Sequence, residues 1–87
     1  MDPSEVQQQI RDFMSRTFLF EFDGGIDADT DLFEAGLIDS FGFIELVGFV
    51  EETFQIKLSD DDLASPETAT LAGTSRLVVQ RLANGSP

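Results

Sequence analysis

The sequence predicts an all-α domain with three longer helices, one short helix and a long loop between the first and second helices. Three stretches repeat large apolar residues at three- and four-residue spacing, which is the period of an amphipathic helix. Phe18, Phe20 and Phe22 alternate as a strand would, but no second run offers them a pairing partner. Nine Phe residues supply a core, and 87 residues suffice for one domain only.

The first helix is predicted to begin at Pro3, because Asp2 is a favourable N-cap and proline suits the first helical turn. Its apolar face consists of Val6, Ile10, Phe13, Met14, Thr17 and Phe18. We interpret Phe20 and Phe22 as apolar anchors at the helix end. A loop then runs from the Asp-Gly-Gly at residues 23–25 to about Asp39. The residues expected to pin this loop to the core are Ile26, Leu32, Phe33, Leu37 and Ile38.

The second helix is predicted from about Ser40 to Phe54, and it is apolar nearly all round. One stripe should face the core and consists of Phe43, Val47, Val50 and Phe54, with Leu46 beside it. A second apolar strip, formed by Phe41, Ile44 and Gly48, lies among acidic residues. Acidic residues disfavour full burial of the helix, so this strip indicates a surface for a partner.

Two further helices are expected in the second half of the chain. Ser59 is a favourable N-cap for a short helix that starts with three aspartates and must stop before Pro66. The last helix is predicted from near Thr70 to the Asn-Gly at residues 84–85. The inward residues of this last helix are Leu71, Ser75, Val78 and Leu82.

Composition excludes several classes of function. The chain has no His and no Cys, which removes imidazole bases, thiol nucleophiles, common zinc sites and disulfides. No apolar run is long enough to span a membrane, and the N-terminal stretch does not resemble a secretory signal. We therefore expect a cytoplasmic single domain over residues 1–87, with an ordered core of about 3–83 and short tails.

The negative charge is concentrated in the middle of the chain. The formal net charge is -12, and residues 21–62 contain thirteen acidic residues and one basic residue, Lys57. Such a charge disfavours binding to nucleic acid or to anionic membranes. A one-sided acidic field instead predicts a basic partner.

Alternating aspartates in the loop raise the possibility of a calcium site. Asp27, Asp29 and Asp31 have the spacing of calcium ligands, but an EF-hand beginning at Asp27 would place Leu32 at the glycine position and Ile38 at the final glutamate position. No metal site is predicted, although the loop remains a candidate for loose cation binding.

Ser40 is the candidate site for covalent chemistry. A serine that opens a helix is commonly an N-cap, and no neighbouring base is present to activate its hydroxyl. A phosphoester on this serine would lie at the positive end of a helix, where an anion is favoured. The position therefore suits modification by another enzyme.

Several ordered motifs resemble the acyl carrier protein family. They are DLFEAGLIDSF at residues 31–41, IELV at 44–47, EETF at 51–54, IKLSDDDL at 56–63 and SPETATL at 65–71. With its flanks, the resemblance extends over roughly residues 5–83 at compatible spacing.

The resemblance implies an antiparallel four-helix carrier domain that is not an enzyme and acts as a monomer. Ser40 would receive 4'-phosphopantetheine from coenzyme A through a phosphopantetheinyl transferase. The thiol of this arm would then carry an acyl or aminoacyl group as a thioester. Partners would also include a loading ligase or synthase and downstream transferases with basic docking patches. The expected cofactor-binding residues are Ser40, as the covalent attachment point, and Asp39 before it. The expected partner-binding residues are Leu37, Phe41, Ile44, Glu45, Gly48, Glu51 and Glu52.

Two alternatives stay open at this point. The first is an acidic helical adaptor that has no prosthetic group and docks through its second helix. The other is a calcium-responsive helical protein. Many members of the carrier family have Leu after the serine, whereas this chain has Phe41, and Gly48 also departs from common members. These departures indicate a specialised carrier.

Overall fold

The computed structural model describes residues 2–83 and shows α-helices α1 (Pro3–Phe18), α2 (Ser40–Phe54), α3 (Asp60–Ala64) and α4 (Leu71–Ala83), with a 3₁₀ helix, η1 (Pro66–Ala69). No strand occurs in this range, so the predicted all-helical class is confirmed. The three longer helices and the short α3 match the prediction, whereas η1 was not anticipated. The predicted end of the last helix at residues 84–85 lies outside the described range.

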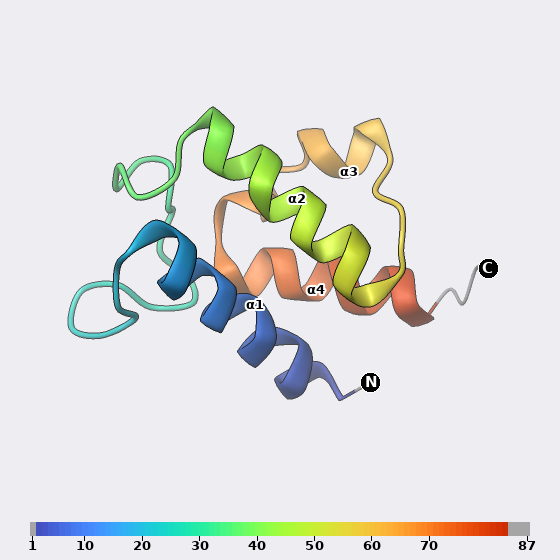
Figure 1. Cartoon of the computed structure of the whole chain (residues 1–87), viewed down its shortest axis with the longest axis horizontal. Coiled ribbons are helices and arrows are strands. Elements are labelled where there is room, and N and C mark those ends of the chain that lie inside the picture. The colour runs from blue at the N-terminus through green and yellow to red at the C-terminus, as the bar shows by residue number, and fades with distance from the viewer. Residues whose placement is uncertain (1, 84–87) are drawn as a thin grey trace.

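The helices pack in one bundle in which α1 runs opposite to both α2 and α4 (Figure 1). Helices α2 and α4 run in the same direction because the segment that contains α3 and η1 carries the chain back along the bundle (Figure 1). None of the helices in residues 2–83 is long and apolar enough to cross a membrane.

The core lies where α1, α2 and α4 meet. Its largest fully buried side chains are Val6, Ile10, Met14, Leu32, Leu46, Val50, Leu71 and Val78. In α2 the buried face is centred on Leu46 and Val50, while Phe43 and Val47 of the predicted stripe are only half-buried. The helix is therefore rotated slightly from the predicted orientation, because its first turn packs through Gly42 against α1.

The long loop at residues 19–39 is held by main-chain hydrogen bonds as well as by apolar anchors. The Leu32 amide donates to the Ala69 carbonyl, and the Ala72 amide donates to the Ala28 carbonyl, both at 2.8 Å. Leu32 and Ile38 are buried as predicted, but Phe33 is 38% exposed. The loop is thus fixed onto η1 and the start of α4, which determines where α2 can begin.

Candidate functional site at the start of α2

Ser40 is the first residue of α2, and its side chain is exposed. The N-cap is Asp39, whose carboxylate accepts a hydrogen bond from the Gly42 amide at 2.8 Å and whose carbonyl accepts one from the Phe43 amide at 2.9 Å. The interpretation of Ser40 as a plain N-cap is therefore wrong. Because Asp39 caps the helix, the Ser40 hydroxyl is not required for that role.

The loop places Asp39 and Ser40 at this point. The Leu37 and Ile38 amides both donate to the carbonyl of buried Leu32, at 2.9 and 3.2 Å. Gly36 adopts φ +76°, a conformation that glycine enters without steric cost. This tight turn directs the chain out of the core immediately before the serine.

The end of α1 supports the first turn of α2. A Cβ atom at Gly42 would lie 2.8 Å from a ring carbon of Phe18, which shows how closely the two helices approach there. Further along, the rings of Phe13 and Phe49 stack with centroids 4.2 Å apart. The serine is therefore presented on a rigid helix end that rests on α1.

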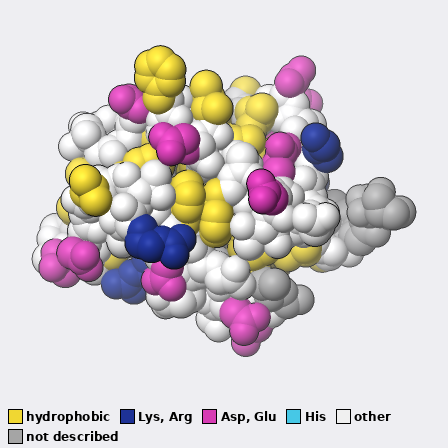
Figure 2. Space-filling model, in the orientation of Figure 1, with side chains coloured by type: hydrophobic (Ala, Val, Ile, Leu, Met, Phe, Trp, Pro, Cys, Tyr) yellow, Lys and Arg dark blue, Asp and Glu magenta, His cyan; other side chains and the backbone are white. Residues whose placement is uncertain are grey.

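The outward face of α2 is apolar near Ser40 and acidic beyond it. Phe41 is 80% exposed and Ile44 is 67% exposed. Glu45, Gly48 and Glu52 are also exposed on this face. In Figure 2, hydrophobic and acidic side chains lie beside one another on the surface over α2. The structure thus brings together the apolar strip and two of the predicted acidic residues.

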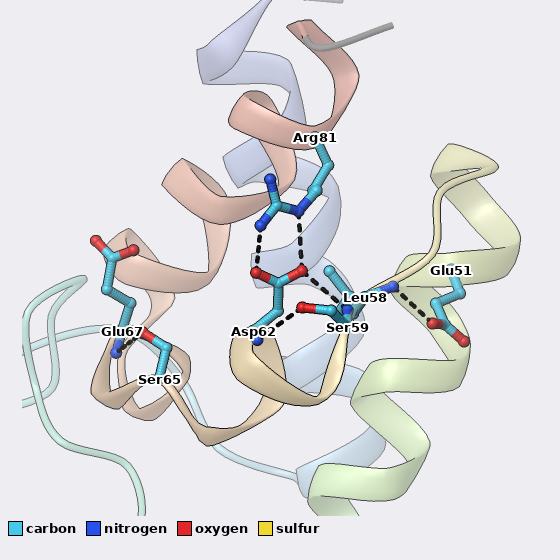
Figure 3. Close-up of polar contacts among 7 residues, drawn as sticks. All are labelled: Glu51, Leu58, Ser59, Asp62, Ser65, Glu67 and Arg81. Carbon is cyan, nitrogen blue, oxygen red and sulfur yellow. Dashed lines mark hydrogen bonds and ion pairs between the residues drawn. The ribbon is translucent and has the colours of Figure 1, made fainter. Parts of the chain in front are cut away.

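Two further predicted partner residues differ from this group. Leu37 is half-buried and packs against the core. Glu51 is half-buried, and its carboxylate accepts a hydrogen bond from the Leu58 amide at 2.9 Å (Figure 3). Glu51 therefore ties the end of α2 to the segment that leads into α3.

A buried ion pair joins α3 to α4, and the sequence analysis did not find it. Asp62 is 5% exposed, and its carboxylate accepts hydrogen bonds from two nitrogens of the Arg81 guanidinium and from the Ser59 amide (Figure 3). The guanidinium, with the Ser59 amide, holds the pKa of the Asp62 carboxyl well below its ordinary value. Ser59 is the N-cap of α3, as predicted, and it forms a capping box with Asp62.

The loop aspartates have structural roles of their own. Asp27 accepts hydrogen bonds from the Asp29 amide and the Thr30 hydroxyl, and Asp31 accepts from the Phe33 and Glu34 amides. These are turns stabilised by side-chain carboxylates. Within residues 2–83, no three acidic side chains cluster so that they could hold a metal ion.

The geometry at Ser40 suits a covalently attached phosphate group. The hydroxyl faces solvent at the positive end of a fifteen-residue helix, and the first amides of that helix have no partner one turn earlier. A phosphodiester on Ser40 would leave the cap intact, because Asp39 bonds the Gly42 amide. A flexible arm attached there would extend away from the core.

Comparison with known proteins agrees with this geometry. Residues 19–78 match the family model described as a phosphopantetheine attachment site. The chain therefore belongs to this family of carrier proteins, which are non-catalytic and use phosphopantetheine as their prosthetic group. This result confirms the predicted family.

One relative is a D-alanyl carrier protein from Streptococcus uberis. It is 42% identical to this chain over 53 residues, which are 61% of this chain and 65% of that protein. The chain thus matches less than two thirds of the relative's length.

Proposed function

We propose that Ser40 is the attachment residue and that the protein carries an aminoacyl group as a thioester on its phosphopantetheine arm. The observation that carries the assignment of Ser40 is its exposed hydroxyl at the first position of α2, inside the segment that matches the family. No other group of this site is needed for the chemistry, because the arm supplies the sulfur.

The modification is a group transfer from coenzyme A. The Ser40 Oγ forms a new bond to phosphorus, the pyrophosphate bond of coenzyme A breaks, and adenosine 3',5'-bisphosphate leaves. The hydroxyl proton passes to a base of the transferase or to solvent. This chain contributes a positioned hydroxyl and nothing catalytic, so a phosphopantetheinyl transferase must supply the catalytic groups.

Two observations favour a small aminoacyl cargo. The relative in Streptococcus uberis is named a D-alanyl carrier. The cavity between α2 and α4, lined by Leu46, Val50 and Val78 among others, has a volume of only about 10 Å³. A long acyl chain would gain about 0.8 kcal/mol for each CH₂ group that it buried, whereas the cavity in this structure is about the size of one water molecule.

Intact-mass measurement tests the site. After incubation with coenzyme A and a transferase, the wild-type chain should gain the mass of one phosphopantetheine group, and Ser40→Ala should gain none. Ser59→Ala is the matched control, since it removes the serine N-cap of α3 at a cost of about 1 kcal/mol but keeps Ser40, so it should gain the same mass as wild type. An unmodified wild type would support the adaptor alternative, and modification of Ser40→Ala would show that another residue is the site.

The cargo is tested with the holo protein. An amino-acid-activating ligase with ATP and D-alanine should add an aminoacyl mass that hydroxylamine removes, as expected for a thioester. Loading by a fatty-acyl ligase but by no aminoacyl ligase would contradict the proposed cargo and leave the assignment of Ser40 standing.

A further inference from the structure

Leu19 occupies an unfavourable position for a leucine. It follows α1 as the C-cap residue, with φ 60° and ψ 47°, and its side chain is 86% exposed. A side chain in this left-handed conformation is sterically strained, and glycine or asparagine is the usual choice after a helix. An exposed leucine there gains almost nothing from burial. The fold alone therefore does not explain Leu19.

The end of α2 provides an internal comparison. Gln55 is the C-cap of α2, with φ 56° and ψ 49°, which is nearly the same backbone conformation. Its side chain is exposed and polar, and its amide donates to the Glu52 carbonyl. The same structural position thus holds a hydrophilic residue at one helix end and a large apolar one at the other.

The apolar C-cap lies at the same end of the bundle as Ser40. Phe18, the residue before Leu19, packs against Gly42 in the first turn of α2, and Figure 1 shows the end of α1 beside the start of α2. Gln55 lies at the far end of α2, about 20 Å from Ser40 at 1.5 Å per residue. Among residues 2–83, the exposed large hydrophobic residues are Leu19, Phe33, Phe41 and Ile44.

We propose that Leu19 is a contact residue for the phosphopantetheinyl transferase and extends its docking surface from α2 onto the end of α1. This inference rests on the proposed function of Ser40. A protein interface of ordinary size covers about 800 Å² on each partner, a patch about 30 Å across. Such a patch centred on Ser40 reaches about 15 Å in each direction, and the end of α1 lies within this reach because Phe18, next to Leu19, packs against the first turn of α2.

The charges at this end define the chemistry of the partner surface. Glu34 and Asp39 are exposed in the loop that leads to Ser40, whereas exposed Arg16 lies in the last turn of α1 before Leu19 and lines a surface pocket together with Glu21. A complementary surface therefore presents an apolar depression for Leu19, with Arg or Lys toward the loop before Ser40 and an acidic group toward Arg16.

The test compares matched substitutions at the two C-caps. Leu19→Asn introduces a residue that tolerates the left-handed conformation and removes the apolar contact. Gln55→Asn places the same residue at the C-cap of α2, at the far end. The readout is kcat/KM for transfer from coenzyme A to Ser40, together with Tm. We expect Leu19→Asn to lower kcat/KM about fivefold, which corresponds to about 1 kcal/mol, while Tm stays equal or rises. Gln55→Asn should leave kcat/KM unchanged. Leu19→Met keeps a large apolar side chain and should have the kcat/KM of the wild type.

Each outcome bears on the inference directly. Equal kcat/KM for Leu19→Asn and wild type would overturn it while leaving Ser40 assigned, since the phosphopantetheine mass would still appear. A drop in Tm of several degrees for Leu19→Asn would show that leucine serves the fold, and would also overturn it. If the wild type gains no mass, the proposed function fails and the inference fails with it.

Discussion

The two ends of α2 differ in how they use polar and apolar groups. At the first end Ser40 and Phe41 are exposed, and the Asp39 carboxylate is the cap that holds the helix start. In the last turn, the Glu51 carboxylate accepts a hydrogen bond from the Leu58 amide. The segment that follows α2 is anchored by the ion pair between Asp62 and Arg81. One end leaves its polar and apolar groups exposed, and the other holds the bundle together.

This difference shows that acidic residues in one segment can serve unrelated purposes. Asp39 caps a helix, Glu45 and Glu52 face solvent, and Asp62 is buried in an ion pair. Counting charges along the sequence treats all of these residues as one acidic field. Their contributions to stability and to partner encounter should separate when they are changed one at a time.

The largest effect on stability is expected from Asp62→Asn. Loss of one partner from a buried ion pair is strongly destabilising, and the cost here is reduced because the Arg81 side chain is 33% exposed. We expect a loss of about 2 to 3 kcal/mol, or a fall in Tm of about 10 to 20 °C. Thermal unfolding followed by circular dichroism measures it.

Asp61→Asn is the matched control for this change. Asp61 lies in the same helical turn but is exposed, so its loss should cost less than about 1 kcal/mol through the helix dipole. Equal effects of the two substitutions would mean that the ion pair contributes no more than a surface charge.

The pH dependence of stability follows from the same carboxyl. Because the pKa of Asp62 is lowered in the folded state, the unfolded chain takes up this proton first as pH falls below about 4. The contribution of Asp62 is therefore fully present above that pH and is lost progressively below it.

The difference between the unfolding free energies of wild type and Asp62→Asn isolates this contribution. This difference should be constant from about pH 5 to about pH 7, where Asp62 is ionised in both the folded and the unfolded state. It should shrink below about pH 4. A difference that stays constant to about pH 2 would show that the pKa of Asp62 is not lowered in the folded protein.

Much of the fold followed from the sequence because its signals are local. Apolar spacing located α1, α2 and α4, and Asp2, Ser59 and Pro66 marked helix boundaries that the structure reproduces. The cap of α2 was misassigned by one residue, since Asp39 and Ser40 are both good N-caps and only the geometry distinguishes them.

The remaining features depend on contacts between distant residues. Asp62 and Arg81 are 19 positions apart, and nothing in the three consecutive aspartates singles out the third as buried. The exposure of Leu19 likewise depends on the left-handed turn that follows Phe18. The only local feature that distinguished Asp62 from Asp60 and Asp61 was its capping-box spacing from Ser59.

A smaller effect is expected from charge reversal on the outward face of α2. Glu45→Lys with Glu52→Lys changes two exposed carboxylates, so helicity and Tm should stay nearly constant. Association with a basic transferase should slow by about tenfold at low salt, and its salt dependence should flatten. Stopped-flow kinetics at several salt concentrations measures this, with Glu51→Ala as a contrasting variant that should lose stability because the Leu58 amide loses its acceptor.

Substitution in the apolar strip on the same face is expected to change the dissociation rate of the complex, whereas charge reversal is expected to change the association rate. Ile44 is 67% exposed, so Ile44→Ala should create no cavity and should raise the dissociation rate of the complex a few fold with little change in Tm. A loss of stability of about 2 kcal/mol or more, as for a core residue, would contradict its assignment to the surface.

The smallest expected effect is the response of stability to salt. Exposed carboxylates on α2 and in the loop repel one another over a Debye length of about 30 Å at 0.01 M salt, and this length falls to about 10 Å at 0.1 M. Raising NaCl through this range should therefore increase Tm by a few degrees, because the buried Asp62–Arg81 pair is screened less than the surface charges. Glu45→Gln with Glu52→Gln should reduce that increase by removing two of the repelling charges.

Magnesium or calcium at matched ionic strength should add little beyond screening, since the Asp27 and Asp31 carboxylates already accept hydrogen bonds within their turns. A flat response to NaCl would mean that the acidic residues are spaced too widely to destabilise the fold, and that their charge acts on partners alone.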